Sequence, residues 1–222
     1  MYEPRLPLRR HEESILQFEQ EPIVKGKILF YGSSTFTRWR ERCGNPDLET
    51  VIRMRDGAQA CVNHGFGGST AEELLYFYPR AVKPWEPRAL VLYAFGNDYN
   101  FDYTAAEAFP LLARVMEYAR EDFPGVKIFL CNVRPTPYEL ELPETRQQEI
   151  RAYNSLVAEY CIAHDDTSFV DHYQCPDFFE AGHAGELTAV RRDIFIEDKL
   201  HLNAAGYAIY TQFFKEILKD YL

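Results

Sequence analysis

The chain has 222 residues, of which 46% are hydrophobic and 15% aromatic, so one α/β domain spanning residues 1–222 can bury a core without disulfides or metals. Its net charge of -10 argues against a nucleic-acid surface, because phosphate binding requires clustered Lys and Arg, and repulsion between negative charges disfavours anionic membranes. No run is long enough to span a bilayer, the amino terminus lacks the apolar core of a signal peptide, and the five scattered cysteines indicate no disulfide framework, which together favour a cytoplasmic protein.

Apolar runs that alternate with helical patterns organise the rest of the chain. Residues 1–25 are polar with weakly helical spacing and predict an arm or short helix packed on the domain. Strands are predicted near residues 27–31, 60–63, 89–95, 126–133 and 168–171. Helices are predicted near residues 36–44, from residue 71 onward, and at 104–121, 143–163 and 204–222, with Thr70 and Asn203 as caps. This alternation predicts a five-stranded parallel sheet with helices on both faces, and residues 172–197 form a long loop or lid.

Three hydroxyls, Ser33, Ser34 and Thr35, follow Gly32 directly after the first predicted strand. Ligands bind at the carboxyl ends of the strands in open α/β sheets, so a hydroxyl here is well placed to act as a nucleophile. Ser and Thr after a strand are also ordinary helix N-caps, and this stretch alone does not separate the two interpretations.

Later segments supply groups that would activate such a hydroxyl. Asp198 and His201 are three residues apart, so the carboxylate can orient the imidazole while the imidazole accepts a serine proton. Gly68, on an open glycine-rich loop, offers a backbone N–H, and Asn97, after the third strand, offers a side-chain amide; both can stabilise a developing oxyanion. Each feature alone is more commonly a turn or a helix start, but Asn203 already caps the last helix, and all of them fall on one edge of the sheet.

Four blocks of the chain resemble those of the SGNH hydrolases, also called GDSL esterases or lipases. They are ILFYGSSTFTRW, NHGFGGST, GND and DKLHLNAAGY, in the family's order and spacing. The resemblance implies a flavodoxin-like three-layer α/β/α sandwich, no metal or cofactor, and hydrolysis of esters or thioesters. It implies that Ser34 is the nucleophile, His201 the base and Asp198 its partner, with the N–H groups of Ser34 and Gly68 and the Asn97 amide as oxyanion donors. Ser33 stands where the family has Asp, which leaves the choice between two adjacent serines slightly open.

Several functions are compatible with this pattern. The leading expectation is a serine esterase acting on a small-molecule ester with a small acyl group, including a carbohydrate O-acetyl. Aromatic residues could instead line a pocket for longer acyl chains in a lysophospholipase or thioesterase; these are Phe178 and Phe179 in the long loop, and Tyr99, Phe101 and Tyr103 after GND. A non-catalytic binding protein on the same scaffold is the alternative from another class. His64 lies beside the glycine-rich loop and could touch substrate, whereas the other histidines show no metal-ligand spacing.

Overall fold

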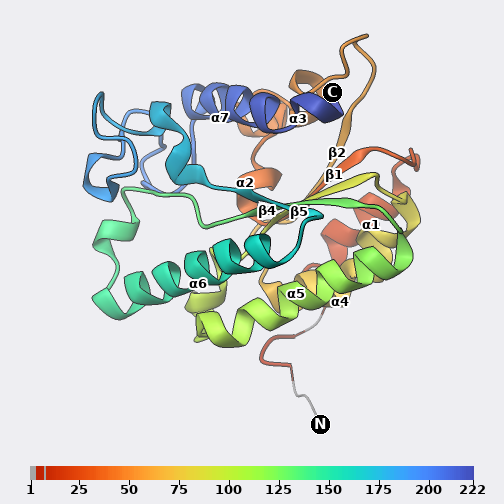
Figure 1. The fold of residues 1–222 in the computed structure, drawn as a ribbon, viewed down its shortest axis with the longest axis horizontal. Coiled ribbons are helices and arrows are strands. Elements are labelled where there is room, and N and C mark those ends of the chain that lie inside the picture. Colours follow the sequence, from red (N-terminus) through yellow and green to blue (C-terminus); the bar gives the residue numbers. More distant parts are fainter. Residues whose placement is uncertain (1–3, 8) are drawn as a thin grey trace.

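An all-parallel sheet of five strands, in the order β2-β1-β3-β4-β5, forms the middle of the computed structural model, which describes residues 4–7 and 9–222 (Figure 1). The strands are β1 (Ile28–Gly32), β2 (Cys61–Gly65), β3 (Ala89–Tyr93), β4 (Lys127–Cys131) and β5 (Thr167–Val170). The predicted five-stranded parallel sheet is therefore confirmed. The strands predicted over 89–95 and 126–133 extend two residues beyond the ends of β3 and β4, because Ala94, Phe95 and Val133 stay buried after strand pairing ends.

Helices cover both faces of the sheet and complete the predicted three layers (Figure 1). One face carries α1 (Glu12–Gln20), α4 (Ala71–Ala81), α5 (Ala105–Asp122) and α6 (Glu144–Ala163). The other face carries α2 (Ser34–Thr37), α3 (Leu48–Val51) and α7 (Ala204–Ile217). Alternate residues of each strand enter opposite cores, so that Leu29 and Tyr31 pack under the first group and Ile28 and Phe30 under the second.

The observed helices begin close to the predicted positions, whereas two of the predicted helix lengths were wrong. The Thr70 side chain accepts from the Glu73 N–H in a capping box, and the Asn203 side chain accepts from the Gly206 N–H, which confirms both predicted caps. The helix predicted over 36–44 is instead α2 followed by a 3-10 turn at Glu41–Cys43. The last helix ends at Ile217, before a 3-10 turn at Lys219–Tyr221.

Two glycines allow the loops after β1 and β2 to meet. Gly32 lies level with Gly65 of β2 and with Tyr93 of β3, so three loops leave the sheet side by side. A Cβ at Gly32 would lie 2.5 Å from the Tyr93 carbonyl oxygen, and one at Gly65 would overlap the backbone nitrogen of Thr37. The close approach of α2 to the strand ends therefore depends on the absence of side chains at these positions.

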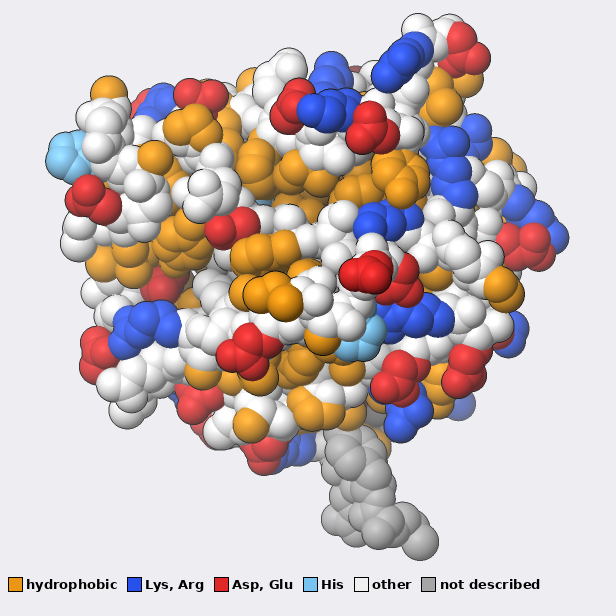
Figure 2. Space-filling view, viewed as in Figure 1, with side chains coloured by type: hydrophobic (Ala, Val, Ile, Leu, Met, Phe, Trp, Pro, Cys, Tyr) orange, Lys and Arg blue, Asp and Glu red, His pale blue; other side chains and the backbone are white. Residues whose placement is uncertain are grey.

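Acidic and basic side chains are interspersed over the face shown in Figure 2. None of the helices within residues 4–7 and 9–222 is long and apolar enough to cross a membrane. The predicted amino-terminal arm contains α1, while residues 1–3 and 8 lie outside the described residues. Residues 172–197 include three short 3-10 helices, at His172–Gln174, Pro176–Phe178 and Leu187–Ala189.

Candidate active site

A chain of two hydrogen bonds joins Ser34, His201 and Asp198. The Ser34 Oγ lies 2.9 Å from Nε2 of His201, and Nδ1 of the same ring lies 2.6 Å from Oδ2 of Asp198. With its proton on Nδ1, the imidazole donates to the carboxylate and accepts from the serine hydroxyl, which satisfies all three groups. The structure thus brings together residues 167 positions apart in the sequence, in the arrangement that Ser34, His201 and Asp198 were predicted to adopt.

The two adjacent serines have different environments. Ser34 is the first residue of α2, and its hydroxyl points at the imidazole. Ser33 is 2% exposed and occupies the N-cap position, where its backbone carbonyl accepts from Phe36 N and Thr37 N while its side chain makes no cap bond. Only the Ser34 hydroxyl is therefore bonded to His201.

A tight turn presents Asp198 and His201 together. Oδ1 of Asp198 accepts from the backbone N–H groups of Leu200 and His201, both at 2.9 Å, which leaves Oδ2 for the ring. Lys199 takes the left-handed conformation, with φ of 59°, that reverses the chain between them. This turn fixes the carboxylate before any substrate binds.

Burial and neighbouring charges tune this pair. Burial lowers the pKa of His201, the hydrogen bond from its ring to Asp198 opposes that effect, and the Arg38 charge lowers the pKa further. For Asp198, burial acts to raise the pKa, but hydrogen bonds from the His201 backbone and ring and from the Leu200 N–H outweigh it and lower the pKa. At neutral pH the imidazole is thus mainly neutral and able to accept a proton, beside an ionised carboxylate.

The Asn97 amide connects two of the loops beside Ser34. Its Nδ2 donates to the Ser69 carbonyl at 3.0 Å, which ties the loop after β3 to the loop after β2 and leaves a second N–H on the same nitrogen. Asn97, Ser34 and His201 line one small cavity of about 20 Å³. The amide is therefore close enough to the hydroxyl to contact the same bound group.

Gly68 lies on the loop that packs against Ser34. A Cβ on its neighbour Gly67 would lie 3.6 Å from the Ser34 Cβ, while Gly68 itself has a φ of +83° that favours glycine. The Gly68 carbonyl accepts a 2.7 Å hydrogen bond from Nη2 of Arg10, which also bonds the buried carboxylate of Glu73. This bond fixes the peptide group between Gly68 and Ser69 from the amino-terminal segment.

Four of the residues predicted as substrate contacts lie in different places. Tyr99 lines a second small hollow that shares Tyr93, Gly96, Arg134 and Leu200 with the cavity at Ser34. His64 is fully buried within β2, stacks on Phe18 and bonds the Ala81 carbonyl, so the structure does not place it at the site. Phe178 is fully buried against Tyr210.

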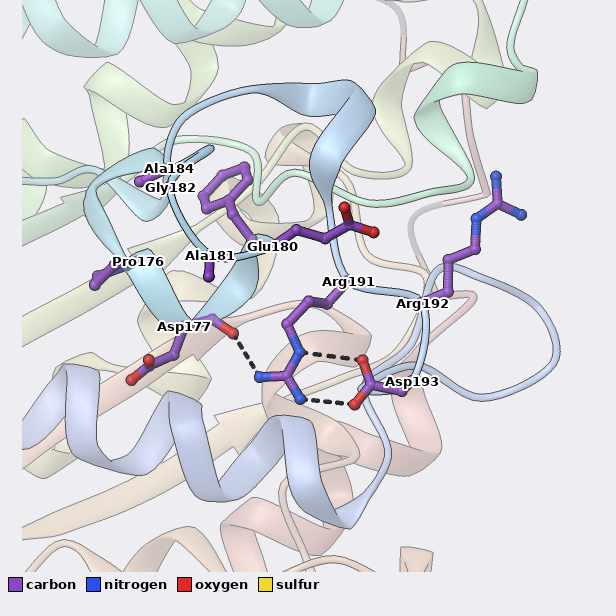
Figure 3. Close-up of a pocket in the computed structure, with 10 residues that line it drawn as sticks. Pro176, Asp177, Glu180, Ala181, Gly182, Ala184, Arg191, Arg192 and Asp193 are labelled. Carbon is purple, nitrogen blue, oxygen red and sulfur yellow. Dashed lines mark hydrogen bonds and ion pairs between the residues drawn. The ribbon is translucent and has the colours of Figure 1, made fainter.

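Phe179 lines a larger hollow, of about 590 Å³, that contains none of the predicted catalytic residues (Figure 3). Arg191 in that hollow donates to the Asp177 carbonyl and pairs with Asp193, as the dashed lines in Figure 3 show. The three aromatic or imidazole side chains of His64, Phe178 and Phe179 therefore lie apart from Ser34. Their sequence neighbourhood did not reveal the direction of their side chains.

Several residues around the site were not predicted. Arg134 lines the same cavity as Ser34. Its position in the turn after β4, at the same edge of the sheet, was the only feature of the sequence that pointed to a place in the site. Asp98 is fully buried, and its Oδ1 accepts from the Ala71 N–H at the start of α4; burial raises its pKa to about 7. Arg10 and Glu73 gave no sequence signal, since they meet across 63 residues. Within residues 4–7 and 9–222, no group of three or more His, Cys, Asp or Glu side chains is placed to hold a metal ion.

A polarised hydroxyl, an oriented imidazole and a free amide N–H around one cavity are the groups that acyl transfer requires. The family model described as GDSL-like Lipase/Acylhydrolase matches residues 30–209, which is most of the chain. The protein belongs to this family. It is accordingly a hydrolase of the esterase type, and the resemblance seen in the four sequence blocks is confirmed.

Solved structures show the same fold at low sequence identity. A GDSL-like lipase from Bacteroides thetaiotaomicron has a TM-score of 0.74 at 20% identity, covering 97% of this chain and 100% of that one. An acetyl-xylooligosaccharide esterase mutant from Geobacillus has a TM-score of 0.62 at 17% identity, covering 88% and 95%. Comparison with curated protein sequences gave no match. The match with solved structures therefore concerns the fold of this GDSL-like hydrolase.

Proposed function

We propose that the protein is a serine esterase that cleaves a small acyl ester, including an O-acetyl group on a carbohydrate, through an acyl-enzyme intermediate. The observation that carries the proposal is the continuous hydrogen-bonded chain from Asp198 through His201 to Ser34. In the first half-reaction, Ser34 Oγ attacks the ester carbonyl carbon while its proton passes to His201 Nε2. Asp198 accepts the hydrogen bond from Nδ1 of the imidazolium that forms.

Charge on the carbonyl oxygen is stabilised by N–H donors in the segments that follow β1, β2 and β3. The second N–H of Asn97 Nδ2 and the backbone N–H groups of Ser34 and Gly68 serve as the oxyanion hole, with each donor contributing about 3 kcal/mol. His201 then gives its proton to the departing alkoxide, and the alcohol leaves. In the second half-reaction a water loses a proton to His201 and attacks the acyl carbon, which releases the acid and restores the Ser34 hydroxyl.

The size of the cavity supports a short acyl group. The hollow at Ser34 and the one beside it each hold about 20 Å³, which is room for about one water molecule or methyl group. The second hollow carries Tyr99, Leu142 and Ile150, and this apolar lining is what favours the alternative of longer acyl chains. The fold shared with an acetyl-xylooligosaccharide esterase supports acetylated sugars as the first substrates to test. The five free cysteines support action in a reducing compartment such as the cytoplasm.

Hydrolysis of p-nitrophenyl acetate tests the catalytic assignment. We expect turnover by the wild type and a loss of at least about a thousandfold in kcat/KM for Ser34→Ala. Ser33→Ala is the matched control and should retain activity within about tenfold, because its hydroxyl does not contact His201. Activity in Ser34→Ala together with an inactive Ser33→Ala would refute the assignment, and an inactive wild type would favour a binding protein.

Chain length distinguishes the two enzyme proposals. Along p-nitrophenyl esters from acetate to octanoate, kcat/KM should fall beyond the shortest acyl groups, because the hollow at Ser34 is small. A steady rise toward octanoate would instead favour the lysophospholipase or thioesterase proposal. Acetate release from acetylated sugars, measured on the same enzyme, tests the carbohydrate class directly.

A further inference from the structure

Arg134 carries a buried guanidinium whose donors are only partly used. The residue is 2% exposed, and its Nη2 donates to the Leu200 carbonyl at 2.7 Å. Its Nε and Nη1 are buried and have no hydrogen-bond acceptor. The guanidinium otherwise lies over the rings of Phe195 and Tyr210, at 5.4 and 5.8 Å from their centroids.

No Asp or Glu of the described residues forms an ion pair with Arg134. Arg120 shows the usual arrangement, since its guanidinium bonds both oxygens of Asp166. An arginine stays protonated in proteins, and a buried charge without a partner is costly unless something else compensates it. The environment of Arg134 therefore calls for an acceptor that the described residues do not supply.

The position of Arg134 indicates what that acceptor is. The residue lines the cavity that also contains Ser34, Asn97 and His201, and its bond to the Leu200 carbonyl holds it beside the residue that precedes His201. A group bound to Arg134 within this cavity would thus lie next to the ester carbonyl that Ser34 attacks. Oxygen anions match a guanidinium best, and a carboxylate fits the planar arrangement of its donors.

We propose that Arg134 is a specificity-determining residue that binds a carboxylate carried by the ester substrate beside the scissile bond. The proposal rests on the proposed esterase function and adds the class of substrate to it. The carboxylate binds on the Ser34 side of Arg134, because the neighbouring hollow is lined by Glu139, a buried carboxyl group with one unpartnered oxygen. The same chemistry arises from an acid group on the acyl part or on the alcohol part of the ester, and the experiment separates these two sources.

The test uses pairs of esters that differ only in charge. Monomethyl malonate and methyl malonamate place a carboxylate or its neutral amide on the acyl part. Acetoxyacetate and acetoxyacetamide place the same two groups on the alcohol part. The ratio of kcat/KM for the carboxylate to that for the amide is measured by acid release in the wild type and in each variant, so that intrinsic reactivity and changes in the amount of folded enzyme cancel.

In Arg134→Met this ratio should fall by about tenfold to a hundredfold for one of the two pairs, since charge-assisted hydrogen bonds are lost. Arg134→Lys keeps the charge without the planar donors and should show a smaller fall. Arg38→Met is the matched control: Arg38 also acts on His201 electrostatically but does not line the cavity, so its ratio should stay within about twofold of the wild type. The pair that responds identifies the acyl or the alcohol side.

An unchanged ratio in Arg134→Met and Arg134→Lys for both pairs would overturn the proposal. An equal loss on all four esters is such a result, because it leaves both ratios unchanged and signifies a structural role. No turnover of either carboxylate ester by a wild type that hydrolyses p-nitrophenyl acetate would also overturn it. If Arg134→Met does not fold, the fall in Arg134→Lys decides. Failure of the esterase proposal itself would appear differently, as the absence of any Ser34-dependent hydrolysis of p-nitrophenyl acetate, and would overturn both.

Discussion

Replacing Glu73 by glutamine should destabilise the protein in a strongly pH-dependent way. The Glu73 side chain is fully buried at the start of α4, where it completes the capping box with Thr70 and pairs with Arg10 and His11. Glutamine can keep the capping-box bond to the Thr70 N–H. Glu73→Gln therefore removes the charge while largely preserving the cap.

The magnitude follows from the pKa of this carboxyl group. Burial acts to raise the pKa of Glu73, but hydrogen bonds from His11 and Arg10 outweigh it and lower the pKa from 4.5 to about 2. A pKa that is lower in the folded state stabilises the protein above the unfolded pKa and loses that effect as the pH falls. The ionised group thus contributes about 3 kcal/mol at pH 7, which is lost progressively between about pH 5 and pH 2.

Urea unfolding at pH 7 and at pH 4 measures this contribution. Glu73→Gln should lower the free energy of unfolding by about 3 kcal/mol at pH 7, and the difference from wild type should be about 1 kcal/mol smaller at pH 4. Glu107→Gln is the matched control, because Glu107 forms the same capping box with Thr104 at the start of α5 but is 44% exposed in its pair with Arg5. Glu107→Gln should lower the free energy of unfolding by at most about 1 kcal/mol.

Two results would refute this reasoning. If Glu73→Gln and Glu107→Gln were equally mild, the buried pair with Arg10 would contribute no more than a surface one. If the Glu73→Gln deficit did not shrink between pH 7 and pH 4, the carboxyl group would not have the depressed pKa. A second readout is kcat/KM for p-nitrophenyl acetate, which should fall in Glu73→Gln because Arg10 also holds the Gly68 carbonyl.

Three further changes test the site and its support. The acid limb of kcat/KM against pH should have its midpoint below pH 6.5, because burial lowers the pKa of His201 and protonation removes the base. A midpoint above pH 6.5 would contradict this. Arg38→Met should raise the midpoint, because the Arg38 charge also lowers the pKa of His201. Asn97→Ala should lower kcat about a hundredfold with little change in KM, and an equal change in KM would assign Asn97 to ground-state binding. Gly65→Ala should lower the melting temperature by at least about 3 °C because its Cβ overlaps backbone, whereas Gly67→Ala, with ordinary contacts, should change it little.

Local patterns in the sequence were sufficient for the sheet and for the residues at its edge. The five predicted strands end within two residues of the observed ones, with continuous apolar runs as the signal for β1 and β3. Parallel pairing then required that the segments after β1, β2 and β3 leave the same edge of the sheet. Ser34 and Asn97 could be placed together because each follows a strand within a few residues. Resemblance to a family favoured Ser34 over Ser33 without excluding Ser33, and only the structure shows which of the two hydroxyls contacts His201.

Side-chain direction and long-range pairing could not be predicted in this way. His64 is one residue before Gly65, yet in a strand successive side chains face opposite ways, so it packs on Phe18 while Asn63 bonds the Phe36 carbonyl beneath α2. Arg10 meets Glu73 only because α1 packs against α4. Such contacts depend on how helices pack and not on any local pattern of residues.

The charges around His201 show how an acidic protein can keep its base neutral. The chain carries a net charge of -10, yet Arg38 and Arg134 both act to lower the pKa of His201. Among the side chains with the largest effects on this pKa, only Asp198 raises it. Burial works in the same direction as the two arginines. A locally positive environment also favours the negative charge that develops on a carbonyl oxygen under attack by Ser34. The same guanidinium that would bind a substrate carboxylate therefore also helps to keep His201 able to accept the Ser34 proton.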